Sequence, residues 1–283
     1  MITRNPDEFG ERAWEFLQAG VERNVLATVF QGARQAQAFG PRPPLFAFYT
    51  GPDGQLTAMA LRTPPWPLLA AGFEDSDLAA ELVRRWTEHD PAVPGVSAEP
   101  ATARAISTAW VRQTGGFAQC DFVEAMHVLT EVVASKRPAQ GRLRTASPDD
   151  RDLLTQWDRD FAVETGVGTG EHAERMVQRR TAAGRQVVWE DAGAPVSTVG
   201  FNLEVAGTVR IGPVYTPPQQ RGRGYATSAV AATSQLLLDR GARQCMLFTD
   251  LANPISNHIY ASIGYVRCGD WEQHGFHATN LPN

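Results

Sequence analysis

The sequence has little cysteine and almost no lysine. Its three cysteines, Cys120, Cys245 and Cys268, are far apart in the chain and odd in number. The spacing is not that of a zinc site, and an odd count does not make a disulfide framework. We therefore predict free thiols in a reducing compartment and no bound metal. Lysine occurs once, at Lys136, while arginine is plentiful, which we attribute to codon bias.

Long apolar runs and an excess of positive charge are also missing. No uninterrupted apolar run reaches the ~18 residues of a membrane-spanning helix, and residues 1–8 lack the apolar segment of a signal peptide. The net charge is −5, whereas a nucleic-acid-binding surface usually needs a basic excess. We expect a soluble, cytoplasmic protein that binds neither membrane nor nucleic acid. A length of 283 residues favours two domains.

The most informative segment is a glycine-rich turn between a predicted strand, 209–215, and a predicted helix, 225–240. Gly222 and Gly224 let the backbone direct its N–H groups toward a ligand. The helix N-terminus adds unpaired donors and about half a unit of positive charge. No lysine follows the turn, as a P-loop requires, and the third glycine of a dinucleotide fingerprint is missing. The pattern predicts a pyrophosphate site.

This turn resembles motif A of the GNAT acetyltransferase superfamily, in which Gln219, Gly222 and Gly224 fill the fixed positions. The resemblance implies that the turn binds the pyrophosphate of acetyl-CoA. It also implies that the strand before the turn splays from its neighbour and pairs with the pantetheine arm. Arg221 and Arg223 either add ionic contacts or are ordinary solvated charges.

A second block supports the resemblance. Asn253 suits a helix N-cap, Pro254 the first helical position and Gly264 the helix end. Asn253 and Tyr260 are two turns apart and lie near one face. The block resembles motif B of the same family, which implies that Tyr260 is the general acid for the departing thiolate; the alternative is a core tyrosine with a satisfied hydroxyl. The residues implied to bind the cofactor are Val214, Tyr215, Thr216, Gln219, Arg221, Gly222, Arg223, Gly224, Tyr225, Ala226, Thr227, Asn253, Ser256 and Tyr260.

The composition changes near residue 140. Residues 135–141 are polar and contain proline and glycine, as in a linker or a strand shared between halves. We expect a degenerate GNAT-like domain in 1–138 and an acetyl-CoA-binding GNAT domain in 139–283. Each is predicted to be α/β (α+β), with a mixed, mostly antiparallel twisted sheet, a V-shaped splay between central strands and flanking helices. In the second half we predict strands at 141–146, 186–190, 195–203, 209–215, 244–250 and 265–272, and helices from 148, at 170–181, at 225–240 and at 254–263.

The first half shows a similar order of elements. We predict strands at 45–49, 56–61, 66–73, 93–97 and 117–133, and helices at 77–86 and 101–114. The glycine turn is absent, and Glu74, Asp75 and Asp77 stand in its place. Their charge would repel phosphate, so we expect no acetyl-CoA here and a structural role, or a wall of the substrate cleft.

The resemblance also implies how the reaction is catalysed. The Val214 N–H is the candidate oxyanion donor and Tyr260 the candidate acid. Relatives of the histone type place a glutamate base on the splayed strand, and the register puts Thr208 there, which cannot act as that base. Glu190, Glu204 or a chain of waters stay as alternatives.

The predicted function is an N-acetyltransferase, an acyltransferase that moves the acetyl group from acetyl-CoA to a primary amine of a small molecule or peptide. The amine would attack directly in a ternary complex. Two alternatives are a different acyl donor, such as a longer acyl-CoA, and a non-catalytic CoA-binding or interaction protein. The sequence names neither the acceptor nor the oligomeric state, and a homodimer is left open.

Overall fold

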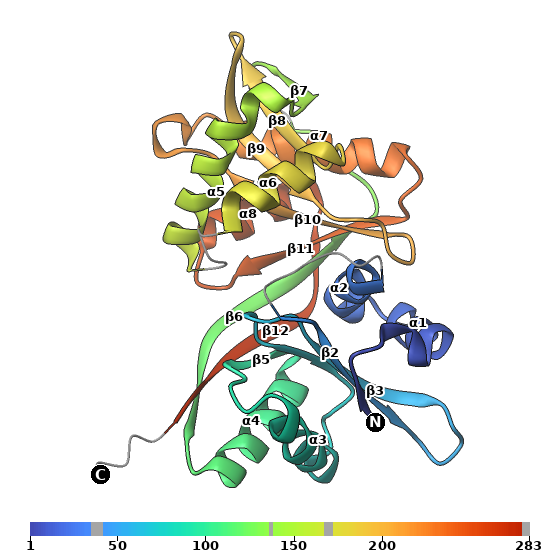
Figure 1. The fold of residues 1–283 in the computed structure, drawn as a ribbon. Helices are drawn as coiled ribbons and strands as arrows, with labels where there is room; N and C mark the ends of the chain where they lie inside the picture. Colours follow the sequence, from blue (N-terminus) through green and yellow to red (C-terminus); the bar gives the residue numbers. More distant parts are fainter. Residues whose placement is uncertain (35–41, 136–137, 167–171, 279–283) are drawn as a thin grey trace. The chain divides into compact units, whose positions relative to one another are not determined.

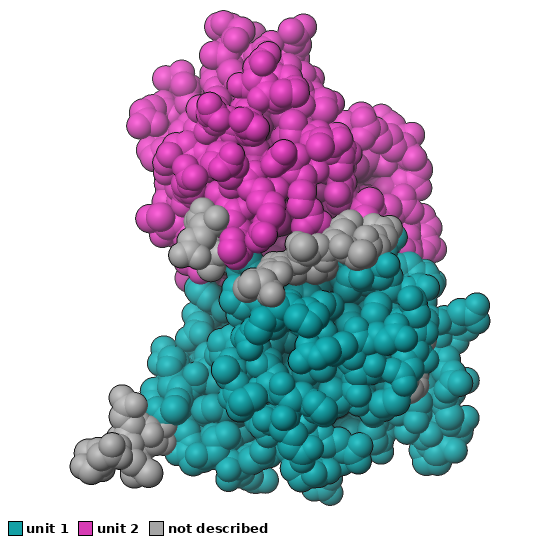
Figure 2. Space-filling view, in the orientation of Figure 1, with its two compact units in different colours: residues 1–126, 268–283 teal, residues 127–267 magenta. Residues whose placement is uncertain are grey.

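The computed structural model describes residues 1–34, 42–135, 138–166 and 172–278. The chain forms two compact units (Figure 2): unit 1 comprises residues 1–126 and 268–283, and unit 2 comprises residues 127–267. The sequence analysis placed the border between 138 and 139, with the whole C-terminus in the second domain. The structure instead groups 127–138 with unit 2 and 268–283 with unit 1. The cause is a strand exchange, described below.

The first half of the chain folds in an order that the sequence predicted in part (Figure 1). The predicted hairpin turns at Gly51–Gly54, where the Gly51 N–H donates to the Gln55 carbonyl at 2.9 Å. Two helices, α1 and α2, were not predicted, although Ala13, Phe16 and Leu17 have helical spacing and are buried. The elements are β1 (Ile2–Thr3), α1 (Gly10–Gln18), α2 (Asn24–Arg34), β2 (Leu45–Thr50), β3 (Leu56–Arg62), β4 (Leu68–Ala71), α3 (Ser76–His89), β5 (Gly95–Ala98), α4 (Pro100–Thr114) and β6 (Phe117–Leu129).

Helices cover both faces of the sheet in unit 1, which explains why strand β2 is apolar at consecutive positions. Leu45 and Ala47 pack with residues of α3 and α4 in one core cluster. Phe46 and Phe48 point to the opposite face, where both rings contact Phe30 of α2 edge-on. Successive strand side chains alternate between faces, so one strand serves two helical layers.

The second half agrees closely with the sequence prediction. Ser147 and Asp150 form a capping box around Pro148, which starts the first helical segment as a short 3-10 turn. The elements are β7 (Arg142–Thr145), α5 (Arg151–Thr165), α6 (Ala173–Ala182), β8 (Gln186–Asp191), β9 (Ala194–Phe201), β10 (Thr208–Tyr215), α7 (Tyr225–Asp239), β11 (Gln244–Asp250), α8 (Pro254–Ile263) and β12 (Val266–His277). The predicted start of α6, at 170, lies outside the described residues.

Both halves have the same order of elements, β-α-α-β-β-β-α-β-α-β. The strand order is β1-β2-β3-β4-β5-β12 at one end and β6-β11-β10-β9-β8-β7 at the other. Each set of five strands is therefore completed by the last strand of the other half. The pairs β4–β5 and β10–β11 are parallel, and the other ladders with a printed register are antiparallel. The predicted mixed α/β fold is confirmed.

Two apolar clusters hold unit 2. One joins α7 and α8 to the central strands, and the other joins α5 and α6 to β8 and β10. Trp157 and Trp189 are buried in these clusters, so they pack in the core. Among the described helices of the whole chain, none is both long enough and apolar enough to cross a membrane.

Candidate functional site

The turn between β10 and α7 has the conformation that its glycines predict. Gly222 and Gly224 have φ angles of 76° and 78°, a region that other residues rarely adopt. A Cβ placed on Gly222 would meet no atom within 4 Å among the described residues, so the requirement is backbone conformation and not crowding. Residues 221–224 are exposed. The turn is therefore an accessible backbone loop.

Helix α7 begins directly after this turn, at Tyr225. Its N-cap is Gly224, and no side chain among the described residues caps the helix. The first N–H groups of a helix have no partner within the helix, so these donors are available to a ligand. Nearby, the Oε1 of Gln220 is buried without a hydrogen-bond partner in the described part of the chain. The exposed N–H groups of this turn are donors of the kind that phosphate groups accept from.

Arg221 and Arg223 differ in their surroundings. The Arg221 guanidinium donates to the Thr216 carbonyl at 2.9 Å and to Glu164 at 2.6 Å, so its charge is already paired. Arg223 is exposed, and it makes no ion pair with any described residue. Gln219 is exposed as well. Of the two arginines, Arg223 is the one whose charge is free for an anion.

Strand β10 splays from β11 partway along its length. The two strands pair from Thr208 to Arg210, whereas Val214 and Tyr215 pair with Val199 and Thr198 of β9. The ladder with β9 shifts register between Ile211 and Val214, and bulges of this kind are common beside active sites. Pro213 adds a position without an N–H. The splay matches the expected opening beside the strand end.

Hydroxyl groups form hydrogen bonds with the C-terminal end of β10. Ser197 donates to the Tyr215 carbonyl at 3.1 Å and lies 2.8 Å from the Thr216 hydroxyl. The Tyr215 hydroxyl donates to Glu164 at 2.9 Å. Burial, followed by the bond to Glu164, raises the pKa of Tyr215 to about 12. The side chains of Tyr215 and Thr216 are thus engaged within the protein, and their carbonyl groups each accept one hydrogen bond, from Ser197 and from Arg221.

Helix α8 starts and ends as predicted. Asn253 caps it by accepting from the Ser256 N–H at 3.2 Å, Pro254 follows, and Gly264 ends it with a φ of 109°. Asn253 therefore has a local structural role that the sequence alone explains. Ser256 is half-buried.

Tyr260 lies on α8 with only 9% of its surface exposed. Its ring meets that of Tyr265 edge-on at 5.9 Å. The Tyr265 hydroxyl is bonded to Ser234 at 2.9 Å. Burial raises the pKa of Tyr260 to about 12. Tyr260 is therefore a buried phenol that keeps its proton at neutral pH.

The structure brings several of the predicted residues together. Val214, Tyr225 and Tyr260 belong to one apolar cluster. The Tyr225 side chain is buried and its hydroxyl donates to Asp191, so only its backbone is placed for a ligand. Ala226 and Thr227 are half-buried in the first turn of α7.

The surroundings of Glu190 and Thr208 disfavour both of them as the general base. Glu190 is bonded to Arg144 and Arg142, and these bonds lower its pKa, which makes it a poor proton acceptor. Thr208, at the expected base position, is buried and accepts from the Gln244 amide at 2.9 Å. The sequence analysis missed Glu164, whose carboxylate accepts from the Tyr215 hydroxyl. The two residues are 51 apart in the chain, and no local pattern links them.

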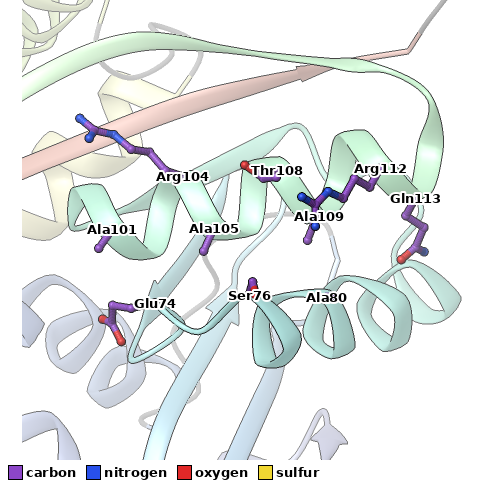
Figure 3. Close-up of a pocket in the computed structure, with 10 residues that line it drawn as sticks. All are labelled: Glu74, Ser76, Ala80, Ala101, Arg104, Ala105, Thr108, Ala109, Arg112 and Gln113. Atoms are coloured by element: carbon purple, nitrogen blue, oxygen red, sulfur yellow. The ribbon is translucent and has the colours of Figure 1, made fainter.

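Unit 1 has its own groove between α3 and α4 (Figure 3). It is a cavity of about 470 Å³ with a floor of alanines and a polar rim. At its edge, the Asp75 carboxylate accepts from the N–H groups of Asp77 and Leu78, at 3.0 and 2.9 Å, and so caps α3. Glu74 accepts from the Thr102 hydroxyl at 2.9 Å. The lining residues are Glu74, Ser76, Ala80, Ala101, Arg104, Ala105, Thr108, Ala109, Arg112 and Gln113.

Residues 152–265 match the sequence profile of the acetyltransferase (GNAT) family. The resemblance to GNAT acetyltransferases is confirmed. The GNAT match contains the glycine turn, the splayed strand and Tyr260. No curated protein sequence matches the chain.

Solved structures share the fold over nearly the whole chain. An acetyltransferase of the GNAT family from Colwellia psychrerythraea is 11% identical, with 99% of this chain and 100% of that chain covered and a TM-score of 0.61. An N-acetyltransferase from Kribbella flavida is 15% identical, with 91% and 96% covered and a TM-score of 0.61. A Drosophila protein is 15% identical, with 96% of both chains covered and a TM-score of 0.66. At such identities the likeness concerns the fold alone.

Proposed function

We propose that the chain is an N-acetyltransferase that transfers the acetyl group of acetyl-CoA to a primary amine, by direct attack in a ternary complex. The observation that carries this proposal is the uncapped start of α7, behind an exposed turn with two glycines at positive φ. The adjoining splay of β10 and the GNAT match over 152–265 support it.

The chain's own groups suit the parts of such a cofactor. The N–H groups from Gly222 to Thr227 would bind the pyrophosphate, because a helix N-terminus favours negative charge. Arg223 would add an ionic contact, whereas Arg221 would act through its bonds to Glu164 and Thr216. The backbone of 214–216 would pair with the pantetheine arm as an added strand. Bound acetyl-CoA would supply an activated thioester.

The catalytic groups have distinct roles. The Val214 N–H would donate to the oxyanion that develops when the amine attacks. Tyr260 would protonate the departing sulfur, which fits a buried hydroxyl whose pKa is about 12 and which therefore carries its proton at neutral pH. Both groups lie in one cluster of unit 2.

Glu164 replaces Glu190 as the carboxylate that we propose for the acceptor. It lies near the end of α5 and contacts Tyr215, on the splayed strand, and Arg221, in the cofactor turn. A carboxylate in this place would accept hydrogen bonds from the amine and orient it, while water would take its proton, because Glu164 is paired with Arg221 just as Glu190 is with Arg144. The acceptor would therefore be a small cationic amine or a peptide with a free amine.

Calorimetric titration with acetyl-CoA tests the proposal. We expect one site in the native chain and no detectable binding in the Gly222→Glu/Gly224→Glu variant, because side chains and negative charge would fill the turn. Gly193→Glu is the matched control, since Gly193 also has a positive φ and no described atom within 4 Å of a built Cβ. That variant should bind as the native chain does.

The alternatives give different results in the same experiment. Tight binding of acetyl-CoA without turnover of any amine in a library would favour a non-catalytic CoA-binding protein. Stronger binding of a longer acyl-CoA would favour a different donor. Absence of binding to the native chain would overturn the proposal.

A further inference from the structure

A cluster of three different ligand types lies in unit 1, where the chain spacing of the cysteines predicted no metal. Cys120 comes from β6, and Glu272 and His274 come from β12. One ligand atom from each of the three lies within 4.8 Å of the others. Glu272 and His274 are two residues apart in one strand, so their side chains are on the same face of the sheet.

The two ligands on β12 are buried and already oriented. Glu272 is 4% exposed and His274 is 8% exposed. The Nδ1 of His274 lies 2.8 Å from the Ser107 hydroxyl, and its Nε2 lies 2.9 Å from Glu272 Oε2. A histidine that ligates a metal usually has its other ring nitrogen in a hydrogen bond that fixes the ring. Ser107 provides that bond here and leaves Nε2 facing the carboxylate and the thiol.

We propose that Cys120 Sγ, Glu272 Oε2 and His274 Nε2 bind a divalent transition metal of the Zn²⁺ class. A thiol, an imidazole and a carboxylate are the three ligand types of zinc sites, whereas Mg²⁺ and Ca²⁺ prefer oxygen alone. Cys120 is exposed, so the ion has a path from solvent and a water can fill the fourth position.

The charges around the cluster favour a cation. The Glu272 carboxylate belongs to the cluster itself, and its negative charge would be balanced by a dication. Binding would convert the Cys120 thiol to a thiolate, with release of the thiol proton to solvent.

Arg104 is the cation that now contacts Glu272. Its side chain is 68% exposed and donates to both carboxylate oxygens. Figure 3 shows it extending away from α3. An exposed guanidinium can keep its bond to Oε1 while a metal takes Oε2, because a carboxylate accepts from several directions.

Titration of the full-length chain with Co²⁺ tests this site independently of any acetyltransferase activity. We expect one equivalent to bind with a thiolate-to-cobalt charge-transfer band and intense tetrahedral d–d bands, and Zn²⁺ should displace both. Cys120→Ser should remove the charge-transfer band. Cys268→Ser is the matched control, an exposed thiol outside the cluster, and should leave the spectrum unchanged.

A positioning variant sharpens the test. Ser107→Ala should weaken Co²⁺ binding by about 10–100-fold while the charge-transfer band at saturation stays. Circular dichroism confirms that each variant is folded. Absence of a charge-transfer band at one equivalent, or the same band in Cys120→Ser, would overturn the proposal. Only weak octahedral bands, from scattered surface carboxylates, would overturn it as well.

Discussion

Helices α3 and α7 occupy the same place in the two halves, each after the fourth strand, but they begin in opposite ways. Helix α3 starts at a carboxylate, Asp75, which accepts from two of its first N–H groups. Helix α7 starts at Gly224 with no side-chain cap among the described residues. The chain thus caps one helix start with its own side chain and leaves the other without a side-chain cap among the described residues. The same dipole stabilises a built-in anion in unit 1 and favours an external one in unit 2.

This difference explains what each turn needs from its sequence. A cap requires only one short acidic side chain in extended backbone, and Asp75 has a ψ of 130°. A ligand-binding turn requires left-handed residues without side chains that would compete for the N–H groups. A single carboxylate at the helix start is therefore enough to block a ligand-binding turn, whereas its removal does not create one, because the left-handed glycines are needed as well.

The largest effect on stability is expected from removing the ion pair at the C-terminal end of α3. Asp90 ends this helix and pairs with Arg62, whose side chain is 2% exposed. Asp90→Ala should lower the free energy of unfolding by about 3–5 kcal/mol, because it leaves a buried charge unpaired. Urea denaturation measures this change. Glu88→Ala, an exposed carboxylate of the same helix that pairs with Arg84, should cost no more than about 0.5 kcal/mol; equal losses would contradict the role of burial.

Giving α7 the cap of α3 tests the comparison directly. Gly224→Asp should weaken acetyl-CoA binding by about 10–100-fold, because the carboxylate would compete for the first N–H groups and repel phosphate. Alanine at position 224 would be strained by the same positive φ but would add no charge. Gly224→Ala should therefore weaken binding much less. Calorimetry compares the two variants. If they bind alike, backbone strain and not capping is the cause.

Variants of Tyr260 and Tyr265 distinguish a catalytic role from a structural one. Tyr260→Phe should lower kcat by about 100-fold, the usual contribution of a general acid, with little change in KM for acetyl-CoA. Because the pKa of Tyr260 is about 12, its proton is retained as pH rises through 10, and no falling limb of the rate should arise from it there. Tyr265→Phe removes a hydroxyl bonded to Ser234 and should cost about 1 kcal/mol of stability without a comparable loss of rate. Steady-state kinetics over pH decide between these outcomes.

The smallest effect is expected from removing the cap of α3. Asp75→Ala should lower the free energy of unfolding by about 1 kcal/mol. It should not create a second acetyl-CoA site, because Glu74 stays beside the helix start and the turn lacks the two glycines. Thermal unfolding and binding stoichiometry are the measurements. A second equivalent of bound acetyl-CoA would show that the cap alone suppresses a site in unit 1.

Local features were predictable because they depend on neighbours in the chain. The glycine turn, the Asn253 cap and the end of α8 at Gly264 each follow from the backbone conformation that one residue requires. The first two helices were missed, although their apolar spacing was visible at Ala13, Phe16 and Leu17. The helical pattern was present in the sequence, and the prediction failed to use it.

The sequence by itself determined the turn, the helix starts and the order of elements, because short-range sterics and hydrogen bonds decide them. The tertiary structure decided which strands complete each sheet, since β6 and β12 could pair with either half. It also placed Glu164 beside Tyr215, and Cys120 beside Glu272 and His274. Such contacts join residues far apart in the chain, and their energy depends on packing that no local pattern encodes.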